Sequence, residues 1–126
     1  MKKILSSPQA PQTIGPYSQA ICINNFLYIS GQIPIDPQTN QVITQGIETE
    51  TRQVLNNIQA ILLEAKMNFE NVIKTSIFMK NMDDFPTVNR VYAEYFKIGN
   101  YPARETIEVA RLPKEVNIEI SIIAHK

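Results

Sequence analysis

Two long segments of this chain carry their apolar residues on one side only, and this constrains the fold more than any other feature. In residues 46–66 the apolar residues recur three and four positions apart, which predicts a helix with one buried side. A second helix is predicted to begin at the acidic pair Asp83-Asp84 and to end at Gly99. Each helix must lay its apolar side on another layer, so we expect both to pack on one face of a sheet.

The apolar stripes show which way each helix is expected to turn. They consist of Ile47, Val54, Leu55, Ile58, Ile61, Leu62 and Ala65 in the first helix, and of Phe85, Val88, Val91, Tyr92, Tyr95 and Phe96 in the second. In the first helix, Glu48, Glu50 and Arg52 fall on the opposite side, which we expect to face solvent. Asn89 is likewise expected on the solvent side of the second helix, away from Phe85 and Tyr92.

Segments rich in β-branched and aromatic residues predict the strands of the sheet. They are residues 17–24, 26–33, 71–79, 104–110 and 116–124. Asn24-Asn25 joins the first two as a tight hairpin, because asparagine tolerates a positive φ. Residues 34–44 are expected to form a loop. The order β-β-α-β-α-β-β predicts an α+β fold with a mixed sheet, in a single domain over residues 1–126.

A sheet with helices on one face leaves its second face uncovered. Ile118, Ile120 and Ile122 alternate with polar residues in the last strand, so one of its sides is polar. In some registers the second face also contains apolar residues such as Ile21 or Leu27. We therefore expect this face to be either solvated or an interface between subunits.

Charge and residue counts exclude several classes of function. Twelve basic residues balance twelve acidic ones, so no basic field favours nucleic acid or membrane lipid. Cys22 is the only cysteine and His125 the only histidine, which leaves no parts for a disulfide, a cysteine zinc site or Ser-His and Cys-His catalysis. Neither a secretory signal nor a membrane span is predicted, and we expect a cytoplasmic protein.

Two charged residues on the last strands are candidates for chemistry. Arg104 opens a predicted strand, and its guanidinium offers a rigid fork of N–H donors that matches a carboxylate. Glu119 lies in mid-strand, where cover by another subunit would raise its pKa unless a partner such as Arg104 keeps it ionised. Such a carboxylate can orient and deprotonate water. A plain surface charge at Arg104 and a solvated carboxylate at Glu119 are the alternatives.

Weaker candidates lie near predicted strand ends. Tyr17 follows a Gly-Pro turn, and its alternative role is to pack in the core. Ser30-Gly31 closes the second predicted strand, where a glycine lets a ligand approach the backbone, although it also suits a plain turn. Cys22 is more typical of a small buried residue than of a nucleophile.

Several segments together resemble the RidA family, also called YjgF/YER057c/UK114. The segments are Ala10-Pro11, Ile14-Gly15-Pro16-Tyr17-Ser18-Gln19-Ala20, Ser30-Gly31-Gln32-Ile33-Pro34, Asp84-Phe85, Val88-Asn89, Tyr92, Tyr101-Pro102-Ala103-Arg104, Glu108-Val109-Ala110-Arg111-Leu112-Pro113-Lys114, Val116 and Ile118-Glu119-Ile120. The resemblance covers roughly residues 8–124. Each segment is weak alone, and their order and spacing in one short chain make the joint signal specific.

The resemblance implies a chorismate-mutase-like fold and a homotrimer, in which three sheets form a central barrel with the helices outside. It implies active sites between neighbouring subunits that need no cofactor and no metal. The implied activity is hydrolysis of reactive 2-enamine and 2-imino acids, such as 2-aminoacrylate and 2-aminocrotonate from PLP-dependent dehydratases, to 2-oxo acids and ammonia. The implied partners are a small carboxylate-bearing substrate and further copies of the chain, with no membrane or nucleic acid.

The resemblance also implies roles for individual residues. Arg104 matches the arginine that binds the substrate carboxylate, and Glu119 matches the glutamate that positions the attacking water. The pocket residues matched are Tyr17, Ser30, Gly31 and Asn89. Thr106 stands where many members have a cysteine, so a hydroxyl can still bind a ligand but thiol reactivity is lost.

Two other functions remain open at this point. One is a non-enzymatic trimer that binds 2-oxo acids or regulates other proteins, in which Arg104 holds a carboxylate without turnover. The other is a ribonuclease or translation inhibitor, a label that some relatives carry. The zero net charge and the single histidine argue against the latter.

Overall fold

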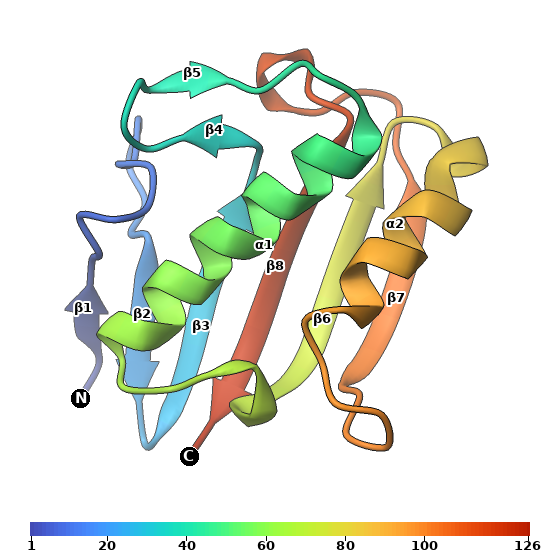
Figure 1. Cartoon of the computed structure of the whole chain (residues 1–126). Helices are drawn as coiled ribbons and strands as arrows, with labels where there is room; N and C mark the ends of the chain where they lie inside the picture. The colour runs from blue at the N-terminus through green and yellow to red at the C-terminus, as the bar shows by residue number, and fades with distance from the viewer.

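The computed structural model describes all 126 residues as two helices packed on one face of a six-stranded sheet (Figure 1). The strands of this sheet are β1 (Lys3–Leu5), β2 (Ala20–Ile23), β3 (Phe26–Gln32), β6 (Val72–Met79), β7 (Ala103–Glu108) and β8 (Ile118–His125). Their spatial order is β1-β2-β3-β8-β6-β7, and only β6 and β7 run parallel. The mixed α+β fold is therefore confirmed, and β1 is an additional edge strand that the sequence analysis did not predict.

The hairpin between β2 and β3 turns where it was expected. Asn24 and Asn25 adopt φ values of 48° and 66°, which are the left-handed conformations that a tight hairpin turn requires. Residues 34–44 are not only a loop, because β4 (Ile35–Asp36) pairs with β5 (Gln41–Val42) in a short second hairpin.

The first helix, α1 (Ile47–Glu64), confirms the prediction over 46–66 and buries the expected stripe. Glu50 corrects the expectation of a solvent-facing side chain, because only 2% of it is exposed. Its carboxylate accepts hydrogen bonds from the Asn117 side chain at 2.9 Å and from the Asn117 backbone N–H at 3.3 Å. A buried carboxylate needs such donors, and here it ties the start of β8 to α1.

The second helix, α2 (Phe85–Ala93), is shorter than predicted and ends well before Gly99. Its start also differs, because the acidic pair belongs to a preceding 3-10 turn over Met82–Asp84. The side chain that caps this turn is Asn81, which accepts a hydrogen bond from the Asp83 N–H.

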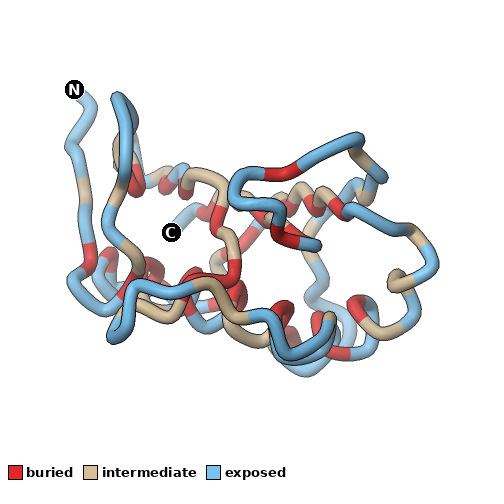
Figure 2. Tube along the Cα trace, turned by 90° about the horizontal axis from the view of Figure 1, so that it is seen from above, coloured by how far each residue is buried: buried red, intermediate tan, exposed pale blue.

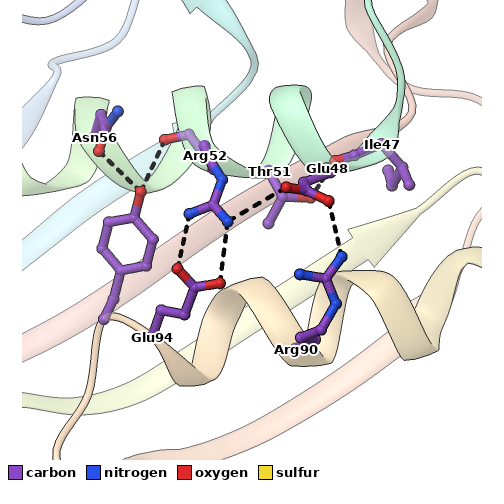
Figure 3. Close-up of polar contacts among 8 residues, drawn as sticks. Ile47, Glu48, Thr51, Arg52, Asn56, Arg90 and Glu94 are labelled. Carbon is purple, nitrogen blue, oxygen red and sulfur yellow. Dashed lines mark hydrogen bonds and ion pairs between the residues drawn. The ribbon is translucent and has the colours of Figure 1, made fainter.

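Ion pairs on the surface hold α2 alongside α1 (Figure 3). The Arg52 guanidinium contacts both carboxylate oxygens of Glu94 at 2.9 and 3.0 Å, and Glu48 accepts from Arg90 at 2.8 Å. Exposed pairs of this kind each contribute little to stability, because solvent screens their charges. Together they fix the orientation of α2 relative to α1, because the Arg52–Glu94 contact is bidentate.

The two faces of the sheet differ in what covers them. Buried positions on strands and helices gather between the two layers (Figure 2), and in β8 they include Ile118, Ile120 and Ile122 as predicted. The other face has no helix on it (Figure 1). Half-buried or exposed apolar residues on that open face are Ile4, Ile21, Ile23, Phe26, Tyr28, Phe78, Ile107 and Ile123. Ile21 thus lies on it as considered above, whereas Leu27 is buried beneath the helices. No helix of the chain is long and apolar enough to cross a membrane.

Candidate functional site

A cavity of about 510 Å³ opens where β3 ends and β8 begins. It contains four of the predicted site residues, Tyr17, Ser30, Gly31 and Glu119, and we call it the Glu119 cavity. Residues 11–14 and the Pro113-Lys114 turn complete its wall. Tyr17 is not a core residue at a strand start. It lies in the loop before β2 with 53% of its surface exposed.

The floor of the Glu119 cavity is an irregularity in β3. The pairing of β3 with β8 shifts register between Ile29 and Gln32, so Ser30 and Gly31 form a bulge. The Ser30 hydroxyl donates a hydrogen bond to the Ser18 carbonyl at 2.6 Å, which fixes the loop that carries Tyr17. A bulge changes the direction of side chains and leaves backbone groups unpaired, and bulges are common next to binding sites. This bulge lies directly under Glu119.

Glu119 stands over Gly31 without any polar partner. Its side chain is half-buried and takes part in no ion pair or hydrogen bond within the chain. Burial disfavours the charged form, so the pKa of the Glu119 carboxyl is raised above its ordinary value. A carboxylate with a raised pKa and free oxygens is equipped to take a proton from a water molecule.

Gly31 is the residue that leaves room for Glu119. A Cβ atom at position 31 would lie 2.7 Å from the Glu119 carboxyl carbon, closer than real side chains approach each other. We therefore expect Gly31→Ala to displace the Glu119 side chain toward solvent. The pKa of its carboxyl, measured by NMR titration, should then fall toward its ordinary value as burial is relieved. The cost in stability should be small, because the obstructing atoms are the free end of a flexible side chain.

The control is the same titration of the wild-type protein. A Glu119 pKa that stays raised in Gly31→Ala would show that the Glu119 side chain does not occupy the space above Gly31.

A buried amide that the sequence analysis missed supports the outer wall of the Glu119 cavity. Gln19 accepts a hydrogen bond from the Ser7 N–H at 2.6 Å and donates to the Pro11 carbonyl at 2.9 Å. It thereby holds residues 7–11 against the sheet, and these lead into the wall. The sequence marks Gln19 only as one residue of the segment 14–20 that carries the family resemblance.

A second cavity, of about 500 Å³, lies on the helix side of β7 and contains Arg104. We call it the Arg104 cavity. Its lining residues are Asn89, Tyr92, Ala93, Tyr101, Pro102 and Arg104. Asn89 corrects the expectation of a position away from Phe85 and Tyr92, because all three lie on the side of α2 that meets Arg104. The Asn89 side-chain oxygen accepts a hydrogen bond from the Arg104 guanidinium at 2.9 Å.

Arg104 carries a charge that nothing in the chain neutralises. Its guanidinium carbon lies 4.9 Å from the centre of the Tyr92 ring and 5.5 Å from that of Phe85. None of the six ion pairs of the chain includes it. A guanidinium has five N–H donors and only one is used by Asn89, so enough remain to bind a carboxylate with two parallel bonds.

Thr106 lies on the same face of β7 as Arg104 but lines neither cavity. Its hydroxyl oxygen is buried and has no hydrogen-bond partner, the one such side-chain atom in the chain. An unsatisfied buried hydroxyl is costly to the folded state.

The structure does not bring Arg104 and Glu119 together within one chain. Arg104 pairs in register with Thr75, which faces the helices, whereas Glu119 pairs with Phe78, which faces the open side. The predicted residues therefore divide into two groups on opposite faces of the sheet. No three acidic, cysteine or histidine side chains come close enough to hold a metal ion.

Comparison with known proteins finds matches over the whole fold. Residues 7–126 match the family described as Endoribonuclease L-PSP. The human protein 2-iminobutanoate/2-iminopropanoate deaminase is 44% identical over 98% of this chain and 90% of its own length. The crystal structure of the Rid-family protein YyfA from Yersinia pestis superposes with a TM-score of 0.97 at 48% identity, over all of both chains. Escherichia coli TdcF, solved with bound serine, has a TM-score of 0.93 at 37% identity over 98% of each chain. The chain therefore belongs to the Endoribonuclease L-PSP family, which is the YjgF/RidA family of its sequence resemblance.

Proposed function

We propose that this protein is a 2-iminobutanoate/2-iminopropanoate deaminase that hydrolyses reactive 2-imino acids to 2-oxo acids and ammonia. The observation that carries this proposal is the state of Arg104. Its guanidinium contacts two aromatic rings and a neutral amide but no acidic side chain. It can therefore bind the carboxylate of a substrate. The human relative that shares 44% of the sequence is named for this activity, and TdcF holds serine, which also bears a carboxylate.

We propose that the working form is a homotrimer in which the Arg104 cavity of one copy closes over the Glu119 cavity of its neighbour. The division of the site residues between two faces supports this, because a single chain holds two incomplete halves. The apolar residues on the open face support it too, since cover by further copies would remove them from water.

The reaction we propose needs only water and these side chains. Arg104 binds the substrate carboxylate and orients the imine carbon toward a water molecule beside Glu119. The water oxygen bonds to that carbon of the protonated imine while Glu119 takes a proton from the water, which gives a neutral carbinolamine. Glu119 then returns this proton to the nitrogen. The C–N bond breaks while the carbinol hydroxyl gives its proton to Glu119, so that ammonia leaves and the carbon becomes the carbonyl of the 2-oxo acid. Oxidation states are unchanged throughout.

The first test couples the protein to a PLP-dependent threonine dehydratase, which releases 2-iminobutanoate. Faster formation of 2-oxobutanoate than in the uncatalysed reaction is the expected result. Binding of 2-oxobutanoate without any acceleration would instead favour a regulatory, non-enzymatic trimer. If the protein neither binds 2-oxobutanoate nor accelerates its formation, the proposal is overturned.

A second test asks whether the two cavities cooperate between copies. Arg104→Ala and Glu119→Gln chains, each inactive alone, are co-expressed in equal amounts. About a quarter of wild-type activity should return, because about three quarters of randomly assembled trimers are mixed and each of these has one intact site in three. No recovery in mixed trimers would show that both residues act within one chain or that they do not act together.

A further inference from the structure

The side of α2 that faces β7 forms the surface on which the Arg104 guanidinium packs. Phe85, Asn89 and Tyr92 lie four and three residues apart and so share one face of the helix. Both aromatic rings lie within the roughly 6 Å over which a cation is attracted to a ring face. Tyr92 is the nearer, at 4.9 Å, and it is buried whereas Asn89 is exposed.

The Tyr92 ring is itself held from behind. Its hydroxyl lies 2.8 Å from the Thr75 hydroxyl, and both residues are buried. Thr75 is the register partner of Arg104 on the adjacent strand, so the contact lies beside Arg104 on the side of the sheet that faces the helices. The Phe96 ring also packs against the Tyr92 ring, with centroids 4.6 Å apart. A ring fixed at its hydroxyl and along its side cannot swing away from the guanidinium.

We propose that Tyr92, locked by Thr75, is a positioning residue that sets the plane of the Arg104 guanidinium and thereby prepares it to bind a planar carboxylate. Asn89 fixes one nitrogen of the guanidinium and Tyr92 fixes its plane, which leaves the remaining N–H groups in one defined direction. The identity of the ligand rests on the proposed function, whereas the ordering of Arg104 does not.

The chain supplies a matched control for testing Tyr92. Tyr95 is a second tyrosine just beyond α2, and its ring packs on Phe69 while its hydroxyl donates to Asn56 at 2.9 Å. It lies outside the Arg104 cavity. Tyr92→Leu and Tyr95→Leu therefore remove the same aromatic group from the same region, and only the first removes the support of Arg104.

Two measurements report the mobility of Arg104 and its affinity for a carboxylate. Side-chain relaxation of the Arg104 Nε–H by NMR, with its signal assigned from its loss in Arg104→Lys, should show a rigid group in the wild type and in Tyr95→Leu but a mobile one in Tyr92→Leu. Calorimetric titration with 2-oxobutanoate should show binding weakened by about 3- to 30-fold in Tyr92→Leu alone. Tyr92→Phe keeps the ring and should recover most of this loss.

Each outcome decides the inference. An Arg104 Nε–H that stays rigid in folded Tyr92→Leu overturns it. If Tyr92→Leu does not fold, Thr75→Val, which keeps the shape and removes the lock, must increase the mobility of Arg104, and an unchanged mobility overturns the inference. Wild-type protein that shows an ordered Arg104 but neither binds 2-oxobutanoate nor hydrolyses the imine would contradict the proposed function while leaving Tyr92 as the residue that orders Arg104.

Discussion

Replacing Arg104 by alanine is expected to lower kcat/KM for 2-iminobutanoate by about 100- to 10,000-fold. A bidentate arginine–carboxylate contact comprises two charge-assisted hydrogen bonds of about 1.5–3 kcal/mol each, and each 1.4 kcal/mol corresponds to a factor of ten. The Arg104 side chain is exposed in the chain, so its removal should leave the fold intact, and we expect the assembly to persist because the apolar open face is unchanged. Coupled-assay kinetics and light scattering measure the two effects.

Arg104→Lys is the control that separates charge from geometry. Lysine keeps the positive charge but offers no planar fork and stacks less well on Tyr92. We expect it to recover only part of the lost kcat/KM. Normal turnover by the correctly assembled Arg104→Ala protein would remove the carboxylate-binding role from this residue.

Patterns within a few neighbouring residues correctly predicted the elements that depend only on those residues. The stripe of α1 follows from three- and four-residue spacing, and the turn at Asn24-Asn25 follows from the tolerance of asparagine for positive φ. The alternating isoleucines of β8 likewise showed which side of that strand is buried.

The elements that were missed depend on partners distant in sequence. Strand β1 has three residues and exists because it pairs with β2, some seventeen positions along the chain. Glu50 is buried because Asn117, 67 residues away, supplies its hydrogen bonds. Asn89 is different, since its spacing from Phe85 and Tyr92 already places the three on one face of a helix.

The division of the candidate site between two faces could not be predicted from the sequence. Whether Arg104 and Glu119 share a face depends on the register of β7 and β8 against β6, and a shift of one residue in either strand would reverse it. The residue types could suggest a carboxylate-binding group and a base. Only the sheet topology shows that one chain keeps them apart, and this is what makes assembly part of the proposed chemistry.

Replacing Glu119 by glutamine is expected to lower kcat by about 100- to 10,000-fold and to change the affinity for 2-oxobutanoate far less. Glutamine keeps the size of the side chain but cannot take a proton. In the wild type, activity should fall as pH decreases through the pKa of Glu119, which burial raises above 4.5, and this acid limb should be absent from any residual activity of Glu119→Gln. An unchanged rate would move the role of base to another group.

The same raised pKa predicts an effect of opposite sign on stability. Because the folded protein binds the Glu119 proton more tightly than the unfolded chain does, the contribution of this group to stability is complete below its unfolded pKa and is lost as pH rises through the folded pKa. Above the folded pKa the wild type therefore bears an ionised, half-buried carboxylate that Glu119→Gln lacks. The inactive variant should unfold at an equal or higher temperature than the wild type at pH 7, and this advantage should diminish below pH 4.5, where the wild-type carboxyl is neutral. A variant that is both inactive and less stable at pH 7 would indicate that Glu119 supports the fold, whereas loss of activity with stability retained is the mark of a group kept for chemistry.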